Sequence, residues 1–372
     1  MNISPFILER YFAEYEFNVP YLLCSSDCES ISIKDLLQLE EESSEKLENV
    51  WLGYTESQGA PNLLKQIANL YSSIDSKDVL TFSGAEEAIY IFMRTMLQQG
   101  ENIVVQSPCY QSLFEVAKSE GITIKQWNMD KDNGWELDLN ELENLIDSKT
   151  KAIVINFPNN PTGYLPSIEK YQQIVDIAKR NDLLLFSDEV YRLFEYNEAD
   201  RLAPACDLYD KAVSLGVLSK SFGLAGLRIG WVACKNPDIL EKLKWYKDYT
   251  TICNSAPSEF LAEIALKNTD KLIDRNKQIT LDNLVLIEEL FTEFSSILSW
   301  NKPKAGVIAF PKFDEAVAEK VNYRKIAEDY GLLLLPGSCY GYPDNYFRIG
   351  YGRKNFPEAI AVFRKYLNEK FN

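Results

Sequence analysis

Short apolar runs and amphipathic stretches alternate through the middle of the chain. Seven runs are rich in apolar and β-branched residues: 79–82, 102–106, 122–127, 151–156, 183–187, 212–217 and 229–234. Several are apolar at consecutive positions, which is typical of strands covered by helices on both faces of a sheet. Between them lie helical patterns, such as the one that places Ile168, Tyr171 and Ile174 on one face. The alternation predicts an α/β domain with a doubly wound, mostly parallel seven-stranded sheet.

The pattern changes after Val232. A long helical region is expected over 238–294, with a break near 254–257, and a last helix begins near Phe356. Shorter β-like runs lie at 307–310, 332–335 and 346–350. These elements predict a smaller α+β domain, on which the N-terminal segment is expected to pack. We therefore expect a large cofactor-binding domain at 46–281, and a small domain made of 1–45 and 282–372.

Composition narrows the class of protein. The chain has 372 residues, of which 46% are hydrophobic and 25% charged, as in a soluble globular protein. Its formal net charge of −16 disfavours nucleic acid and anionic membranes as partners. There is no signal-peptide pattern and no apolar run near the roughly 20 residues that a membrane span needs. The seven scattered cysteines are typical of reduced thiols, so we expect a cytoplasmic protein.

The chain contains no histidine. This excludes Ser-His-Asp and Cys-His nucleophile systems and any His-ligated metal, and we expect no metal site. Proton transfers in an enzyme of this composition must use Lys, Tyr, Asp, Glu or Cys. The chemistry is therefore expected to come from an organic cofactor.

A lysine follows the predicted strand 212–217. Lys220 lies where parallel sheets place ligands, and an amine at that edge can form an imine with an aldehyde. Ser219 and Arg228 flank it, and arginine's planar fork suits a phosphate. Taken alone, a lysine in such a segment is more often a solvated residue in a glycine-rich turn.

Two further strand ends carry polar groups. A buried Asp188 beside a pyridine nitrogen would keep that nitrogen protonated, and Tyr191 could donate to a ring hydroxyl oxygen. Asn160, in the turn Asn-Asn-Pro-Thr-Gly at 159–163, could present its amide to the same oxygen. The alternatives are an ordinary polar strand end and a turn without a ligand.

A fourth segment, 83–88, is predicted to turn from strand into helix. Gly84 allows backbone amides to approach a phosphate, and the start of the helix adds positive potential. A simple capping box, with Ser83 as cap and Glu86 three residues later, explains the same residues. The glycine spacing fits neither a dinucleotide fingerprint nor a P-loop.

In their order and spacing, these four segments resemble the class I/II aminotransferases of fold type I, which depend on pyridoxal 5'-phosphate. The resemblance covers about Gly53 to Arg353. It implies that Lys220 carries the cofactor as a Schiff base and that Asp188 partners the pyridine nitrogen. It implies that Asn160 and Tyr191 contact the phenolic oxygen. The phosphate would be held by Gly84, Ala85, Ser219 and Arg228, with the Glu86 backbone amide.

Three more positions follow from the resemblance. Tyr110 matches an aromatic residue that stacks on the cofactor ring, and Arg348 matches the arginine that clamps the substrate α-carboxylate. Tyr54 matches a tyrosine that reaches the phosphate of a neighbouring subunit, which implies a homodimer with shared active sites. The chain departs from the family at Val217, where many members carry Ser or Thr, and in lacking the histidine that often supports the aspartate.

The reaction expected from this resemblance is amino transfer between an amino acid and a 2-keto acid. The alternative is β- or γ-elimination or replacement, as in a C–S lyase or a cyclase, because the carbanion is common to both. A non-catalytic cofactor-binding sensor is the remaining alternative, disfavoured because only about 50 residues precede Tyr54 and this stretch is acidic overall. Asp27 and Glu29 could select a cationic side chain, or they could be solvated loop carboxylates.

Overall fold

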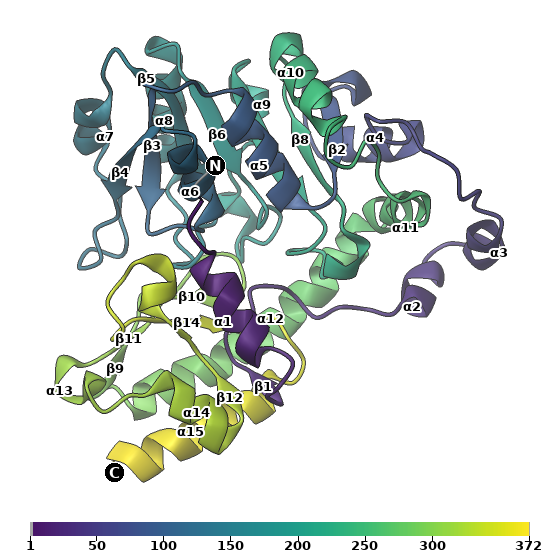
Figure 1. Ribbon diagram of the computed structural model, residues 1–372. Coiled ribbons are helices and arrows are strands. Elements are labelled where there is room, and N and C mark those ends of the chain that lie inside the picture. The colour runs from purple at the N-terminus through teal and green to yellow at the C-terminus, as the bar shows by residue number, and fades with distance from the viewer. Residues whose placement is uncertain (1–2, 372) are drawn as a thin grey trace.

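A computed structural model describes residues 3–371 (Figure 1). Its centre is a seven-stranded sheet in the order β2-β8-β7-β6-β5-β3-β4. Strand β8 is antiparallel to both of its neighbours, and the other neighbouring pairs are parallel. The strands are β2 (Val79–Phe82), β3 (Asn102–Ser107), β4 (Thr123–Asn128), β5 (Thr150–Asn156), β6 (Leu184–Asp188), β7 (Ala212–Val217) and β8 (Gly230–Ala233). The predicted mostly parallel sheet is confirmed.

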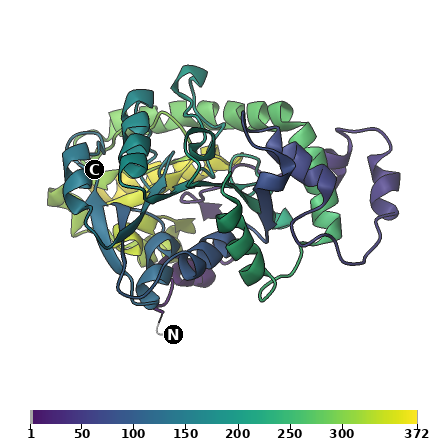
Figure 2. The same cartoon turned by 90° about the horizontal axis from the view of Figure 1, so that it is seen from above.

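Helices cover both faces of this sheet (Figure 2). Successive side chains of a strand point to opposite faces, so Ile103 and Val104 of β3 belong to different core clusters. The first cluster includes residues of α5 (Ala85–Thr95), α6 (Ser112–Ser119) and α10 (Pro237–Lys247). The second includes residues of α7 (Leu139–Leu145) and α8 (Ile168–Arg180). Helices α4 (Pro61–Ala68) and α11 (Ala256–Lys267) contribute to a third cluster at the β2–β8 edge.

The second part of the molecule is built on the long helix α12 (Thr269–Glu293). A small antiparallel sheet, β10-β14-β13, packs with it. Its strands are β10 (Ile308–Ala309), β13 (Leu335–Pro336) and β14 (Phe347–Gly350). Around it lie β9 (Leu298–Ser299), β11 (Lys312–Phe313), α13 (Glu315–Ala318), α14 (Tyr323–Tyr330) and α15 (Phe356–Phe371). This is the expected smaller α+β part, and the predicted break at 254–257 falls between α10 and α11.

The N-terminal segment contacts both parts. Helix α1 (Ile7–Tyr15), purple in Figure 1, lies between them, and β1 (Tyr21–Leu22) pairs in parallel with β12 (Leu332–Leu333). Helix α2 (Ile33–Leu37), by contrast, packs beside α11 and adds two leucines to the core at the β2–β8 edge. Helix α3 (Ser43–Glu48) follows it. The domain boundaries at 46 and 281 stay a prediction.

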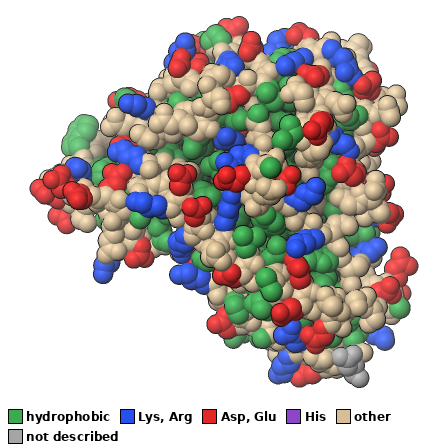
Figure 3. Space-filling model, turned by 180° about the vertical axis from the view of Figure 1, so that it is seen from behind, with side chains coloured by type: hydrophobic (Ala, Val, Ile, Leu, Met, Phe, Trp, Pro, Cys, Tyr) green, Lys and Arg blue, Asp and Glu red, His purple; other side chains and the backbone are tan. Residues whose placement is uncertain are grey.

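Two further observations concern the charges on the surface and the apolar character of the helices. Acidic and basic side chains are intermixed over the face that Figure 3 shows. Among residues 3–371, no helix is both long enough and apolar enough to pass through a bilayer.

Candidate active site

The predicted chemical segments meet at the carboxyl edge of the large sheet. The register pairs Asn156 at the end of β5 with Asp188 at the end of β6, and β7 ends three residues before Lys220. A cavity of about 510 Å³ opens at this edge, a volume typical of small-molecule sites. Most of the predicted site residues line it: Ala85, Glu86, Tyr110, Asn160, Asp188, Tyr191, Ser219, Lys220, Arg228 and Arg348. The structure therefore brings together residues from both parts of the chain.

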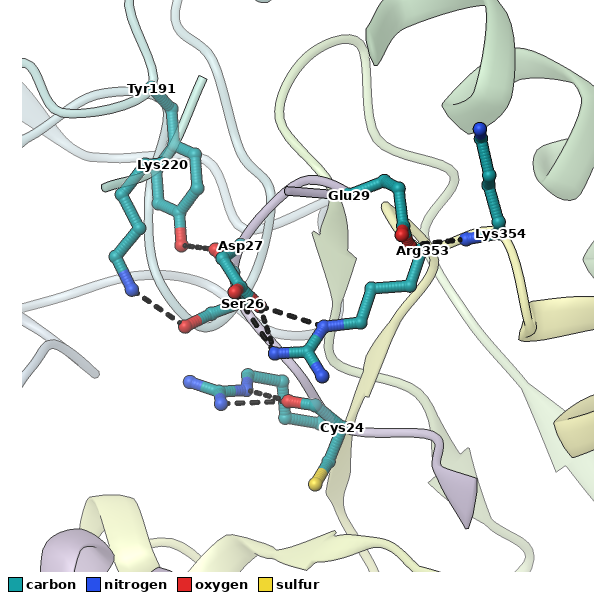
Figure 4. A network of polar contacts seen from close by, with 9 residues as sticks. Cys24, Ser26, Asp27, Glu29, Tyr191, Lys220, Arg353 and Lys354 are labelled. Carbon is teal, nitrogen blue, oxygen red and sulfur yellow. Dashed lines mark hydrogen bonds and ion pairs between the residues drawn. The ribbon is translucent and has the colours of Figure 1, made fainter. Parts of the chain in front are cut away.

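The Lys220 amine reaches into this cavity. Its Nζ donates a hydrogen bond to Ser26 Oγ at 2.9 Å, and Tyr191 donates its hydroxyl to the Ser26 carbonyl at 2.7 Å (Figure 4). Desolvation by the surrounding protein lowers the pKa of the Lys220 amine, an effect partly opposed by Asp27. A lowered pKa leaves more of the amine neutral, which is the nucleophilic form that attacks an aldehyde.

Asp188 is a buried carboxylate with few partners. Its side chain is 5% exposed, and Oδ1 accepts a hydrogen bond from the Val190 backbone N–H at 3.2 Å. It forms no ion pair within residues 3–371, and burial raises its pKa to about 7. The Asn156 side chain donates to the Asp188 carbonyl at 3.0 Å and so holds the strand end in place. A buried carboxylate without a cation fits a protonated ring nitrogen.

Most of the residues predicted to hold the phosphate line the same cavity as Lys220. Arg228 has an exposed side chain, and its Nη1 donates only to the Ala225 carbonyl at 3.3 Å. Gly84 has a φ of 86°, and a Cβ there would lie 2.4 Å from Arg228 Nη2. Helix α5 begins at Ala85, so its free N–H groups face this region. The guanidinium of Arg228, the start of helix α5 and the close approach of the Gly84 backbone together fit a bound phosphate group.

Arg348 forms the floor of the cavity on the side of the small sheet. It is 1% exposed, and its Nε and Nη2 donate to the Cys24 carbonyl at 3.0 and 2.7 Å. Nη1 donates to Asn160 Oδ1 at 3.2 Å and to the Tyr340 hydroxyl at 2.5 Å. These bonds use four of the five guanidinium N–H groups and leave one on Nη2 for a substrate carboxylate.

Two predicted aromatic residues differ in their placement. Tyr110 lines the cavity and donates its hydroxyl to Glu9 Oε1 at 2.9 Å. Tyr54 is 84% exposed and does not line this cavity; it borders a separate hollow of about 450 Å³ with Asn254 and Ser255. Its predicted role concerns a neighbouring subunit, so within one chain the role stays a prediction.

Several lining residues were not expected from the sequence. Helix α1 and its C-cap contribute Glu9, Phe12 and Glu16. The loop after β1 contributes Ser26, beside Asp27, which the sequence had already offered as a possible substrate contact. The only indication in the sequence was the spacing of Glu9, Phe12 and Glu16. They are three, four and seven positions apart, which places them on one face of a helix. Nothing in the sequence indicated which surface that face would meet.

Asp27 and Glu29, proposed above as selectors of a cationic group, already have partners. Asp27 forms a bidentate ion pair with Arg353, with Nη2 at 2.9 Å from both carboxylate oxygens (Figure 4). Glu29 accepts a hydrogen bond from the Lys354 backbone N–H at 2.9 Å. The charge of Asp27 is therefore already compensated by Arg353, and Glu29 is not among the residues that line the cavity.

Known proteins share both the sequence pattern and this fold. The profile of the family "Aminotransferase class I and II" matches residues 21–361. Capreomycidine synthase of Streptomyces vinaceus is 28% identical over 78% of this chain and 74% of its own. A PLP-dependent aminotransferase structure from Streptococcus suis superposes with a TM-score of 0.93 at 28% identity, covering 100% of both chains. The PLP-dependent cyclase OrfR superposes at 0.90 with 26% identity, covering 99% of this chain and 98% of its own.

A lysine, a buried aspartate and a phosphate site at the carboxyl edge of a seven-stranded sheet define a pyridoxal-phosphate enzyme of fold type I. The chain belongs to the aminotransferase class I and II family. Other relatives are named aspartate, alanine and tyrosine aminotransferases. The protein is thus a pyridoxal-phosphate-dependent aminotransferase.

Proposed function

We propose that this chain moves an amino group between an amino acid and a 2-keto acid, with Lys220 as the residue that holds the cofactor covalently. The observation that carries the proposal is the position of Lys220 in one cavity with Asp188 and Arg348. When bound, pyridoxal phosphate supplies a ring that accepts the electron pair of the substrate's α-C–H bond. Asp188 keeps the ring nitrogen protonated, because a cation is what its buried carboxylate lacks.

The other residues bind and orient. Arg228, Ser219 and the backbone amides of residues 84–86 would hold the phosphate, and the Asn160 amide and Tyr191 hydroxyl would bind the phenolic oxygen. Tyr110 would cover one face of the ring. Arg348 binds the α-carboxylate, which fixes which bond at Cα is broken. The Lys220 amine then removes the α-proton, since its lowered pKa leaves more of the amine in the neutral, basic form.

The test is an absorption spectrum of the purified protein with added pyridoxal phosphate, beside Lys220→Ala. We expect a visible band in the wild type that the variant lacks. Loss of the band with an amino acid, and its return with a keto acid, would establish amino transfer. A wild type that stays colourless would contradict the role of Lys220.

A second activity is supported by two relatives. The chain is 28% identical to a protein named capreomycidine synthase and 26% identical to a PLP-dependent cyclase. The same removal of the α-proton precedes ring closure or elimination. Product analysis separates the two: a keto acid with loss of the visible band means transfer, whereas a cyclised or eliminated product with the band retained means the second activity.

We further propose that the enzyme is a cytoplasmic homodimer in which Tyr54 completes the partner's phosphate site. Trp51, Leu52, Tyr54 and Tyr249 are each at least 80% exposed, and large apolar side chains of this kind mark interaction surfaces. Mixing inactive Lys220→Ala and Tyr54→Ala subunits tests the sharing. If sites are shared, half of the sites in each mixed dimer contain both native residues and activity returns. No recovery in mixed dimers would contradict it.

A further inference from the structure

The charges that line the cavity do not balance once the cofactor and a substrate backbone are placed. This argument rests on the proposed function. Among the lining cations, Arg228 is taken by the phosphate, Arg348 by the α-carboxylate and Lys220 by the cofactor. Arg353 is taken by Asp27 through its bidentate ion pair. Besides Asp27 and Asp188, three lining carboxyl groups remain without an ion pair within residues 3–371: Glu9, Glu16 and Glu86. Glu86 lies in the first turn of α5, beside the residues predicted to hold the phosphate, and burial raises its pKa to about 7. Glu9 and Glu16 lie together on α1 and its C-cap.

These two carboxylates lie about one helical turn before and after Phe12, whose ring is close to Arg348. Glu9, Phe12 and Glu16 are spaced by three and four residues, so they share the face of α1 that meets the cavity. The Phe12 ring lies 5.8 Å from the guanidinium carbon of Arg348. A side chain that leaves the α-carbon of a substrate held by Arg348 can therefore reach one of the two acids.

The raised pKa of Glu16 agrees with a carboxylate that lacks a cationic partner. Its side chain is partly buried, and desolvation raises its pKa, although Arg353 partly opposes this. Glu9 accepts one hydrogen bond through Oε1 from Tyr110 and keeps Oε2 available. A bound ammonium or guanidinium group would restore favourable interactions to both carboxylates.

The same geometry disfavours a substrate with a second carboxylate. Recognition of such a group requires a cation beyond Arg348, and Arg353 is the remaining arginine that lines the cavity. Its Nε and Nη2 are held by Asp27 at 2.9–3.2 Å. Glu9 and Glu16 would in addition repel an acidic side chain.

We propose that the amino donor carries a positively charged side chain, a guanidinium or an ammonium group, and that Glu16 and Glu9 are the residues that select it. The inference names the substrate class of the proposed transfer reaction. It concerns specificity and leaves the roles of Lys220, Asp188 and Arg348 unchanged.

The test compares donors that differ in charge but little in shape. The holoenzyme is assayed with L-arginine and L-lysine against L-citrulline, L-alanine and L-aspartate, by keto acid formation and by loss of the visible band. Citrulline matches arginine in length and replaces the cation by a neutral urea group. We expect kcat/KM for arginine or lysine to exceed that for citrulline and aspartate by about 10- to 100-fold, the range for a charged hydrogen bond.

Variants of the two glutamates test whether α1 and its C-cap cause the preference for a cationic donor. Glu16→Gln or Glu9→Gln should reduce kcat/KM for the cationic donor by about 10-fold or more relative to kcat/KM for citrulline, so the preference for the charged donor falls by that factor. Glu14→Gln is the control, since Glu14 lies on α1 with an exposed side chain and does not line the cavity. A holoenzyme that reacts with alanine or aspartate at least as fast as with arginine overturns the inference and leaves the proposed transfer standing. A holoenzyme that reacts with no amino acid overturns both.

Discussion

Replacing Asp188 by Asn should stabilise the cofactor-free protein while it impairs the enzyme. Burial raises the pKa of Asp188 from its ordinary 3.8 to about 7. The carboxyl group thus holds its proton more tightly in the folded than in the unfolded chain. Between these two pH values the folded state binds more protons, so the stability of the native protein falls as the pH rises.

The size of the effect follows from the same shift. A rise of this extent corresponds to about 4 kcal/mol of destabilisation when the carboxylate is ionised. The penalty is absent below about pH 4 and complete above about pH 7. Asparagine has nearly the same shape, its oxygen can still accept from the Val190 N–H, and its amide carries no charge to desolvate.

The assay is urea denaturation of both proteins without cofactor, from pH 5 to pH 8. The variant's advantage in unfolding free energy should grow with pH and level off near about 4 kcal/mol above pH 7. Asp274→Asn, at an exposed position of α12, controls for loss of a charge and should show no such trend. An advantage that does not change with pH, or a variant less stable than the wild type at pH 8, would refute the reasoning. With pyridoxal phosphate bound the order should reverse, because the variant lacks the partner of the ring nitrogen.

Gly84 and Gly350 each lie so close to a neighbouring group that an added Cβ would clash, and alanine substitutions test what these glycines contribute. Gly84→Ala places a methyl group 2.4 Å from Arg228 Nη2 at a φ of 86°, so cofactor affinity measured by titration should fall about 10-fold. Gly350→Ala places a Cβ 1.7 Å from the Ser25 carbonyl oxygen, so thermal unfolding should show a loss of about 1–3 kcal/mol and the KM for the amino acid should rise. Gly226→Ala, with open space at its Cβ, should change neither, and an equal effect there would contradict both predictions.

The large sheet and the residues at its edge could be predicted from the sequence because local patterns specify them. Consecutive apolar positions mark buried parallel strands, and β5, β6 and β7 begin within one residue of the predicted strands and end within one residue of them. Asp188 ends β6 and Lys220 follows the end of β7 by three residues, so the topology alone brings them to one edge. To place either residue at this edge, it was enough to identify the strand that leads to it.

The opposite wall of the cavity depends on contacts between distant parts of the chain. Asp27 and Arg353 are 326 positions apart, and Arg348 meets Cys24 across 324 positions. No local pattern indicates such pairs. For the same reason Asp27 could be read as a selector of substrate charge, whereas the structure shows its charge already compensated by Arg353. Glu9 and Glu16 belong to this wall as well, and only the docking of α1 between the two parts of the molecule brings them to the site.

The cavity places its charged groups where they reduce the stability of the protein without ligands. Burial moves the pKa of Lys220 down and that of Asp188 up, so the same desolvation favours the neutral form of both. The neutral amine is the form that Lys220 needs as a nucleophile and base, whereas Asp188 must be ionised to hold a protonated ring. The cofactor resolves this conflict by supplying the cation that Asp188 lacks, and a cationic substrate would do the same for Glu16. If this reasoning holds, each ligand that brings a positive group should raise the thermal stability of the protein, and should raise it less in the variant that removes the matching carboxylate.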